Sequence, residues 1–407
     1  MGCKTPDFYM TPTQRTTRVL LNMAHTRLLP KEGWGLSRQF ANIKSPLTAR
    51  VGADSTTSRR ILRLPTLERL YLQGVSPGAS VQASTSLRYL ELEGVTGHLH
   101  HLPHHLETLK LFRCSVTDDR STFPPQLRKL SVTGGTLGPR LTLPQSLEEL
   151  ECCVCSCDFE CAHGTVQQFP LLPAGLRSLV LEDMTLLEGD AISLGNLPPA
   201  MQSLYLNDFN TDTTMWFAIP PQSSLRSMRI GVNVGGPYLL PHGLRKLDID
   251  PHGHPLPQLP AGFEELEVKG CRHPLPALPP TRRYLHLREF DFGQDLELPE
   301  GLRKLLLRST KRNLSAGCRM PALPAHLSQL VCWVEDDGAA GTPTLSVRAL
   351  PPNIEVLHLQ GVRLCCAVPA TMRSLRMGDT LQLGVVYDSG RSPTNVVEGA
   401  RYTDIHR

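Results

Sequence analysis

The sequence predicts a solenoid in which about fifteen short repeats stack side by side and share one curved, parallel β-sheet. Two observations carry this prediction. The first is a ten-residue pattern, L-P-x-x-L-x-x-L-x-L, which is clearest at residues 240–249 and returns at 102–111, 172–181 and 298–307. The second is its spacing, because fifteen copies follow one another with a mean period just under 22 residues. Self-similarity at such a short, nearly fixed period is the signature of a repeat architecture.

The first apolar position of each copy marks the extent of the array. It runs over 305 residues in fourteen steps, from residue 67 to residue 372. The residues at this position are Leu67, Leu87, Leu106, Leu127, Leu147, Leu176, Met201, Leu225, Leu244, Phe263, Arg282, Leu302, Leu327, Ile354 and Met372.

Each copy predicts one short strand. The last five residues of the pattern alternate between apolar and other types, as expected for a strand with one buried face. The strands then stack in parallel, one per repeat, on the concave side of the solenoid. Proline fits just before a strand because it cannot donate a ladder hydrogen bond inside one. Repeats this short leave no room for a helix, so proline-dense connections such as 255–260 predict an extended, polyproline-like or irregular convex side.

Three copies depart from the pattern at positions expected to be buried. Arg282 takes the first apolar position of LPPTRRYLHL, so its side chain must either turn outward or find a partner. Cys152 and Cys332 take the last apolar position of their copies. A cysteine there is tolerable because a free thiol packs like a small hydrophobic group.

The pattern resembles the short, proline-bearing leucine-rich repeats of bacterial secreted effectors. It is also similar to the FNIP-type repeats of amoebae and to the leucine-rich repeat proteins of kinetoplastids. The resemblance covers roughly residues 64–378 and implies the leucine-rich repeat fold. Those families usually carry asparagine at the eighth place after the first leucine. This chain has Val95, Cys114 and Gly135 at that place in three successive copies and keeps Asn233.

Charge and composition predict three segments. Residues 1–60 lack the repeat and carry ten Lys and Arg against three Asp and Glu, so we expect a basic, partly disordered leader or cap. Residues 61–378 form the array. In residues 379–407 we expect a last strand at 381–387 followed by a disordered tail. The formal net charge is +4, but residues 61–407 hold 32 basic and 35 acidic residues, so we expect no nucleic-acid partner.

The start of the chain offers a lipidation signal. Gly2 and Cys3 resemble the pair that is myristoylated and palmitoylated in dually acylated proteins, although Pro6 stands where serine or threonine is usual. An ordinary terminus is the simpler interpretation, and membrane association is expected only if this segment is acylated. The twelve cysteines are scattered or clustered, which favours reduced thiols in an intracellular, cytoplasmic protein.

The longest spacer holds the densest group of potential ligands. Cys155, Cys157, Cys161 and His163 could bind zinc tetrahedrally, but their spacing matches no familiar zinc finger. A redox-sensitive thiol cluster is an alternative, and a reduced structural cluster without metal is the expectation. We find no nucleophile paired with a base, no phosphate-binding glycine loop and no separated carboxylate pair, so the sequence predicts neither an enzyme nor a cofactor.

What remains is the concave face of the sheet. The second, fourth and sixth places after each first apolar residue should project from it, and they carry the aromatic and arginine residues that dominate protein interfaces. An acidic block spans 248–267 and a basic block 288–312. The predicted partner-binding residues are Tyr205, Arg229, Lys246, Asp248, Asp250, Glu265, Glu267, Tyr284, His286, Arg288, Lys304, Arg308 and Trp333.

The sequence therefore predicts a non-catalytic scaffold that binds a protein or peptide on its concave face. Two alternatives stay open. One is an adaptor tethered to a membrane through acylated Gly2 and Cys3. The other is the substrate-recognition subunit of an enzyme complex whose catalytic site lies in another chain.

Overall fold

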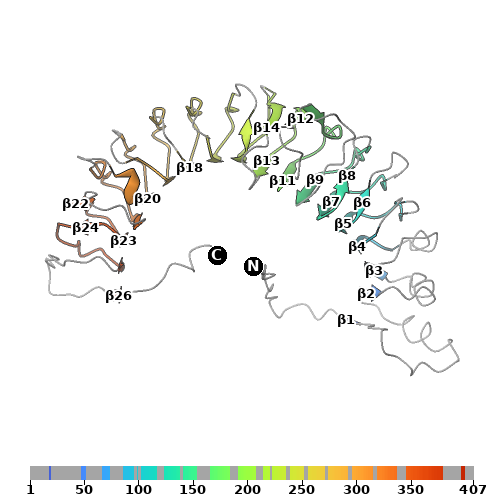
Figure 1. Cartoon of the computed structure of the whole chain (residues 1–407), viewed down its shortest axis with the longest axis horizontal. Coiled ribbons are helices and arrows are strands. Elements are labelled where there is room, and N and C mark those ends of the chain that lie inside the picture. Colours follow the sequence, from blue (N-terminus) through green and yellow to red (C-terminus); the bar gives the residue numbers. More distant parts are fainter. Residues whose placement is uncertain are drawn as a thin grey trace. The chain divides into compact units, whose positions relative to one another are not determined.

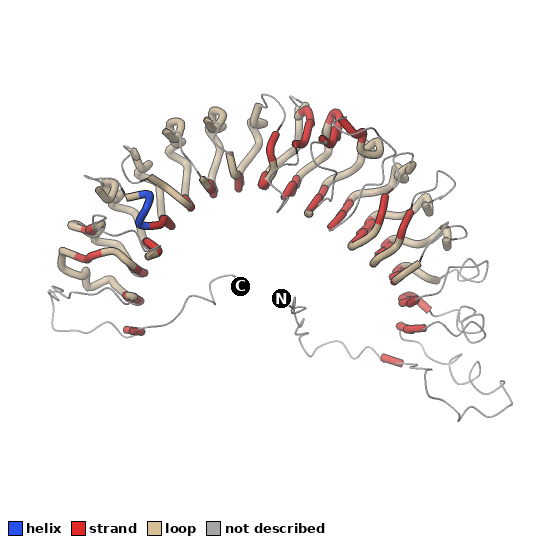
Figure 2. The backbone as a smooth tube through the Cα atoms, in the orientation of Figure 1, coloured by secondary structure: helices blue, strands red, loops and turns tan. Residues whose placement is uncertain are grey.

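The chain forms a parallel β-solenoid of the leucine-rich repeat type that contains almost no helix. The computed structural model describes residues 18–19, 47–51, 67–73, 86–95, 99, 102–116, 123–137, 141–153, 166–183, 191–207, 214–220, 222–234, 239–251, 255–270, 274–291, 296–314, 319–336, 345–378 and 396–398. Within these ranges the one helical segment is a single 3-10 turn, η3 (Lys311–Asn313). It is the blue segment of Figure 2.

The chain divides into two compact units. The first comprises Met1–Ala162, Gln168–Leu176 and Val180–Leu187, and the second comprises His163–Gln167, Arg177–Leu179 and Glu188–Arg407. Within each unit, Figure 1 shows the strands of the main sheet along the inner, concave side and the connecting segments on the opposite side. The concave parallel sheet predicted by the repeat is thus confirmed in each unit.

The main sheet of the first unit is parallel throughout. Its strands pair in chain order, and each repeat adds one strand in constant register, so that Leu90, Leu109, Leu130 and Leu150 lie side by side. The strands are β1 (Arg18–Val19), β2 (Leu47–Val51), β3 (Leu67–Gln73), β4 (Tyr89–Glu93), β5 (Thr108–Phe112), β7 (Lys129–Thr133) and β9 (Glu149–Cys153). Because β1 and β2 belong to this sheet, it begins inside the segment 1–60 that the sequence assigned to a leader or cap.

The main sheet of the second unit has the same parallel topology. Its strands are β13 (Ser203–Asn207), β15 (Ser227–Gly231), β17 (Lys246–Ile249), β18 (Glu265–Lys269), β19 (Tyr284–Arg288), β20 (Lys304–Thr310), β21 (Gln329–Glu335), β23 (Val356–Gln360) and β25 (Ser374–Met377). The residues of β11 (Ser178–Glu182) are shared between the two units. A final strand, β26 (Val396–Glu398), pairs with β25, whereas the strand expected at 381–387 falls outside the described residues.

The side opposite the main sheet is extended, as predicted, but it also carries short strands that the sequence pattern did not reveal. Figure 2 shows these as the outer red segments. They are β6 (Ser115–Val116) with β8 (Thr136–Leu137), β12 (Ala191–Asn196) with β14 (Thr214–Ala218) and β16 (Asn233–Val234), β22 (Ser346–Val347) with β24 (Arg363–Leu364), and β10 (Val166–Gln168). The proline-dense connections 255–260 and 274–279 form no strand, because proline has no N–H to donate.

The proline of the pattern closes a turn in front of each strand. The N–H of Leu244 donates to the carbonyl oxygen of Pro241 at 3.0 Å. The N–H groups of the next two residues, Arg245 and Lys246, both donate to the carbonyl oxygen of Arg226 in the preceding repeat, at 2.9 and 3.0 Å. The same arrangement recurs at Leu302 and other first positions. The fixed φ of proline preorganises the turn, and the carbonyl groups of one repeat position the next.

The apolar positions of the pattern form the core. In the repeat at 240–249, Leu244, Leu247 and Ile249 are buried, whereas the residues between them face outward. Cys152 and Cys332 are also buried, which confirms that the cysteines behave as small core residues. Burial raises the pKa of the Cys332 thiol, because the charged thiolate would lose its hydration.

Arg282 follows the second of the two courses that the sequence offered. Its side chain is fully buried, with 0% exposure, and its three side-chain nitrogens donate no hydrogen bond to any of the described residues. The guanidinium instead lies over the ring of Phe263, the first apolar residue of the preceding repeat, at 4.9 Å from the ring centroid. Burial lowers the pKa of Arg282 to about 10. Arg282 therefore does not turn outward, and the aromatic ring of Phe263 is its partner.

The place usually occupied by asparagine is apolar in two successive repeats of the first unit. Val95 and Cys114 are both buried. The thiol of Cys114 donates weakly toward the carbonyl oxygens of Leu92 and Phe112, with 3.4 Å from sulfur to each oxygen. A thiol therefore makes the backbone contacts that an asparagine amide would otherwise supply.

Candidate partner-binding face

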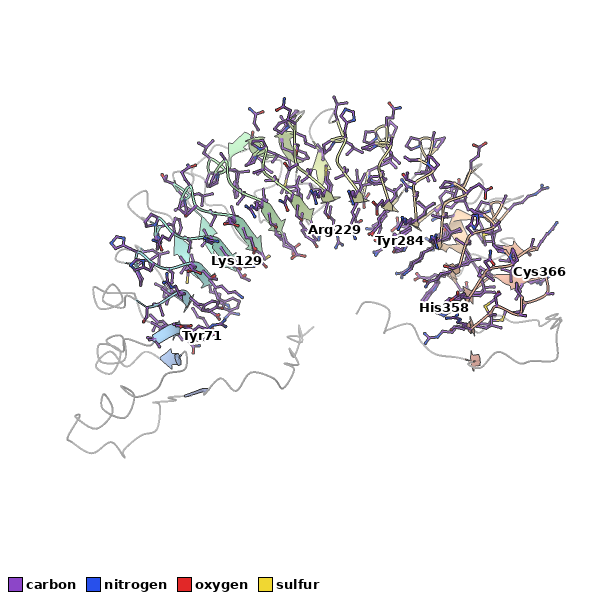
Figure 3. The ribbon with its side chains drawn as sticks, turned by 180° about the vertical axis from the view of Figure 1, so that it is seen from behind. Tyr71, Lys129, Arg229, Tyr284, His358 and Cys366 are labelled. Atoms are coloured by element: carbon purple, nitrogen blue, oxygen red, sulfur yellow. The ribbon has the colours of Figure 1, made fainter. Side chains whose placement is uncertain are left out.

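Three rows of side chains project from the main sheet of the second unit. The register aligns Asp248, Glu267, His286, Leu306 and Val331 on consecutive strands of the middle row. All thirteen predicted partner-binding residues lie on this face, on β13, β15 and β17 to β21 or directly after β17. Figure 3 shows the labelled side chains of Arg229, Tyr284 and His358 on this side of the unit and Cys366 on the opposite side.

The part of the face formed by β15, β17 and β18 is a ladder of ion pairs. Arg229 Nε lies 2.8 Å from Asp248 Oδ2, and Lys246 Nζ lies 2.9 Å from Glu265 Oε1. Each pair joins neighbouring strands, because the register places the two side chains opposite one another. The guanidinium of Arg229 also stacks on Tyr205 at 4.9 Å from the ring centroid.

Glu267 is the most strongly coordinated carboxylate of the face. Its Oε1 lies 3.2 Å from His286 Nδ1 and 2.6 Å from Arg288 Nη2. Burial acts to raise the pKa of Glu267, but the hydrogen bond from His286 and the positive charges of His286, Arg288 and Arg229 outweigh it and lower the pKa. The pKa of Asp248, on the neighbouring strand, is raised by burial and by the charge of Glu267. Negative charge is therefore concentrated on Glu267.

The acidic block that the sequence suggested is paired with cations of the same face. Carboxylates of the acidic block contact cations on adjacent strands, and Lys269 Nζ adds a further contact to Asp250 Oδ2 at 3.6 Å. His286 is also less accessible than predicted, with 8% exposure, because it packs between Glu267 and the neighbouring strand β20. The acidic block is therefore largely neutralised by the solenoid itself.

The part of the face formed by β19 to β21 is apolar and aromatic. Leu306 and Val331 occupy the middle row and are buried, although they point away from the core of the solenoid. On one side, Lys304 Nζ lies over the ring of Tyr284 at 5.3 Å from its centroid. On the other, the guanidinium of Arg308 lies over Trp333 at 5.6 Å and pairs with Glu335. We name Tyr284, Lys304, Leu306, Arg308, Val331 and Trp333 the aromatic–cationic patch.

Leu306 and Val331 were missing from the predicted site residues. The sequence holds a partial signal for them, because KLLL at 304–307 and LVC at 330–332 place three apolar residues in a row. A strand with both faces apolar buries side chains on both sides. The signal is not specific, because Leu179, Val180 and Leu181 form the same run in another repeat, where Val180 is only half-buried.

The patch continues into β23 and β25 with a neutral histidine and an arginine. His358 lies opposite Val331 on one side and Arg376 on the other. Its Nε2 is 3.5 Å from the Ser374 hydroxyl oxygen, and its buried Nδ1 has no hydrogen-bond partner among the described residues. Burial and the charge of Arg376 lower the pKa of His358, so the ring is neutral at pH 7.

The first unit carries an aromatic cluster of its own. The rings of Tyr71 and Tyr89 lie 5.6 Å apart, and the guanidinium of Arg69 lies 5.5 Å from the centroid of Tyr89. The Tyr89 hydroxyl donates to Glu91 Oε2 at 2.7 Å, and burial together with this contact raises the pKa of Tyr89. These neighbours hold Tyr89 rigidly in place on the sheet.

Several predicted sites fall outside the part of the chain that the structure describes. They are the lipidation residues and the potential zinc ligands, Gly2, Cys3, Cys155, Cys157, Cys161 and His163. Among the described residues, no group of three or more histidine, cysteine, aspartate or glutamate side chains is arranged to hold a metal ion. In the same ranges no helix has the length and apolar character needed to span a membrane.

Comparison with known proteins identifies solved structures that share similarity with this chain. No protein-family model and no curated protein matches the sequence. YopM from Yersinia enterocolitica WA-314 is 22% identical with a TM-score of 0.45, over 77% of this chain and 67% of YopM. TLR13, in a complex with ssRNA13, is 15% identical with a TM-score of 0.43, over 84% of this chain and 58% of TLR13. CroV588, a circular leucine-rich repeat protein, is 13% identical with a TM-score of 0.26, over 82% and 72% of the two chains.

Proposed function

We propose that this leucine-rich repeat solenoid is a non-catalytic scaffold that binds a protein or peptide through the sheet face of its second unit, centred on the aromatic–cationic patch. The observation that carries the proposal is the position of Leu306 and Val331. They lie in a row that faces away from the solenoid core, yet they are apolar and shielded by Tyr284, Trp333 and the cations stacked on them. On a sheet face that contacts only solvent, we would expect polar side chains at these two positions.

The composition of the patch matches that of an interface hot spot. Tryptophan, tyrosine and arginine are the residue types whose truncation most often costs binding energy. Arg308 already stacks on Trp333, and Lys304 on Tyr284, in the free protein. Because these side chains are ordered before a partner arrives, less conformational entropy is lost when the complex forms.

The ion-pair ladder on β15 to β18 has a different role in this proposal. Its charges already have partners within the solenoid, such as Arg229 with Asp248 and Arg288 with Glu267. Paired, partly exposed charges add little affinity on their own, but they exclude partners whose charges do not match. We therefore expect the ion-pair ladder to decide which partners are excluded and the aromatic–cationic patch to supply most of the binding free energy.

The test of the proposal is the substitution Trp333→Ala. We expect it to weaken partner capture by at least about 1–2 kcal/mol, or about five- to thirtyfold in Kd. The melting temperature should change little, because Trp333 projects from the sheet and is not in the solenoid core. The measurement is a quantitative pull-down from cell lysate with the tagged, full-length chain, followed by mass spectrometry of the captured proteins.

Trp216→Ala is the matched control. Trp216 is 44% exposed, but it lies on β14, one of the short strands opposite the main sheet. This substitution should leave capture unchanged. The proposal fails if both tryptophan variants recover every partner as wild type does, or if Trp216→Ala reduces recovery as much as Trp333→Ala.

A further inference from the structure

We infer that the occupant of the aromatic–cationic patch is an extended acidic peptide segment, in which two carboxylates four to six residues apart flank an apolar side chain. This inference rests on the proposed function and specifies its partner. It follows from three features of the face: its uneven charge, the two cations that lack a carboxylate, and the apolar surface between them.

The charge of the face changes sharply along the second unit. On β15, β17 and β18 the projecting places hold three basic and four acidic residues, namely Arg229, Lys246, Lys269, Asp248, Asp250, Glu265 and Glu267. On β19, β20, β21, β23 and β25 the same face holds four basic residues, Arg288, Lys304, Arg308 and Arg376, and one acidic residue, Glu335 at the end of β21. The patch therefore lies in the half of the face where basic residues outnumber acidic ones.

Two of these four cations have no carboxylate partner among the residues that the structure describes. Arg288 pairs with Glu267, and Arg308 pairs with Glu335. Lys304 contacts the ring of Tyr284 but no carboxylate of the described residues, and the exposed Arg376 likewise contacts no carboxylate of these residues. An incoming carboxylate would meet these two charges without displacing an existing ion pair.

The distance between the two cations sets the spacing of the expected carboxylates. Lys304 lies in the first row on β20, and Arg376 lies in the middle row on β25. The two positions are therefore three strand spacings apart across the sheet and two residues apart along the strand direction. Three spacings of about 4.8 Å and an offset of two residues give about 16 Å between the two Cα atoms. An extended peptide covers about 3.3 Å per residue, so about five residues span this distance.

The surface between the two cations is formed by one apolar side chain and one neutral side chain. Val331 and His358 lie in the middle row between Leu306 and Arg376, and His358 is neutral at pH 7. A polar side chain placed there would lose hydration without gaining an ionised partner. The segment between the two carboxylates is therefore expected to carry an apolar residue.

A nucleic acid fits this surface less well than an acidic peptide. Phosphate backbones bind along continuous rows of cations, whereas Lys304 and Arg376 are isolated. On the strands just before the patch, Asp248, Glu265 and Glu267 already pair with the cations, so a phosphate chain that continued along the face would have to compete with these carboxylates. A discrete pair of carboxylates avoids this competition.

The inference is tested with defined probes and the full-length chain. The main probe is a fluorescein-labelled peptide, Ser-Glu-Ser-Leu-Ser-Leu-Glu-Ser, whose two glutamates are five residues apart. The comparison probes are a peptide of the same composition with adjacent glutamates, a peptide with lysine in place of both glutamates, and a short single-stranded RNA. Fluorescence anisotropy measures their binding to wild type and to the variants Lys304→Gln, Arg376→Gln and the double variant.

We expect the spaced acidic peptide to bind most tightly. Each single variant should weaken it about two- to fivefold, as for an exposed ion pair, and the double variant about tenfold. Arg363→Gln is the control, because Arg363 is an exposed arginine on β24, opposite the main sheet, and its loss should leave binding unchanged. Equal melting temperatures would show that the variants fold alike.

Four results would overturn the inference: no saturable binding of the spaced peptide, equal binding of the lysine peptide, tighter binding of the RNA, or unchanged binding in the double variant. Its failure can be separated from failure of the proposed function. If Trp333→Ala still reduces partner capture while Lys304→Gln with Arg376→Gln does not, the face binds a partner of another chemistry.

Discussion

Leu247→Ala is expected to lower the free energy of unfolding by about 2–5 kcal/mol. Leu247 lies in the middle of the second unit with 2% of its side chain exposed, between Met228 and Leu266 of the adjacent strands. Truncation removes buried methyl groups and leaves a cavity that the stacked repeats can only partly close. Because each repeat is stabilised by its neighbours, the loss should spread along the solenoid. Urea denaturation followed by circular dichroism measures the effect.

Arg245→Ala is the control for this experiment. Arg245 lies two residues before Leu247 in the same repeat, but its side chain is exposed and its contact with Glu264 is long, at 3.5 Å. Its removal should change the free energy of unfolding by less than about 0.5 kcal/mol. If the two variants unfold at the same urea concentration, Leu247 does not pack in the core and the register of the repeat is wrong.

The second large effect should be a gain in stability. Arg282→Leu is expected to raise the free energy of unfolding by about 3 kcal/mol, the energy that corresponds to a pKa lowered from its ordinary value to about 10. Arg282 is fully buried and donates no hydrogen bond to the described residues, and its charge lies over the ring of Phe263. Leucine restores the residue that most repeats carry there. Arg283→Leu, at the exposed neighbouring position, should give no such gain.

The gain from Arg282→Leu should depend on pH in a defined direction. The folded-state pKa of Arg282 is lower than the unfolded-state pKa, so between these values the unfolded chain binds more protons and stability rises with pH. The cost of the buried charge is fully present below about pH 10 and is relieved as the pH rises above it. The difference in stability between Arg282→Leu and wild type should therefore shrink above about pH 10. A constant difference would show that desolvation of the charge is not the cause.

The repeat pattern predicted the main sheet well. Each of the fifteen copies begins a strand where expected, and the alternation of types correctly assigned residues such as Leu247 to the core and Asp248 to the face. The prediction succeeds because neighbouring strands have similar sequences and pair in constant register. A position that is correctly assigned to the core or to the face in one repeat is therefore correctly assigned in the next. The short strands opposite the main sheet have no such regular pattern, and the sequence did not reveal them.

The site was less predictable because it depends on pairs of residues from different repeats. The stacking of Arg282 on Phe263 and the burial of His286 beside Glu267 both follow from cross-strand neighbours about twenty residues apart. Single positions gave the residue types of the face correctly. Single positions could not show that Glu267 pairs with Arg288, whereas Lys304 contacts no carboxylate of the described residues. Charge on a sheet face is decided by register, and register is a property of neighbouring strands.

Site-specific photocrosslinking tests the central claim most directly. A photoreactive phenylalanine analogue at residue 329 replaces Gln329, which lies on β21 in the first projecting row, between Lys304 and Val356. The same analogue at residue 239 replaces Leu239, which is 85% exposed and lies in the segment before Pro241 and not on a strand. Irradiation in cells should crosslink a partner at residue 329 and not at residue 239. The opposite result, with crosslinks at 239 and none at 329, would contradict binding on the sheet face.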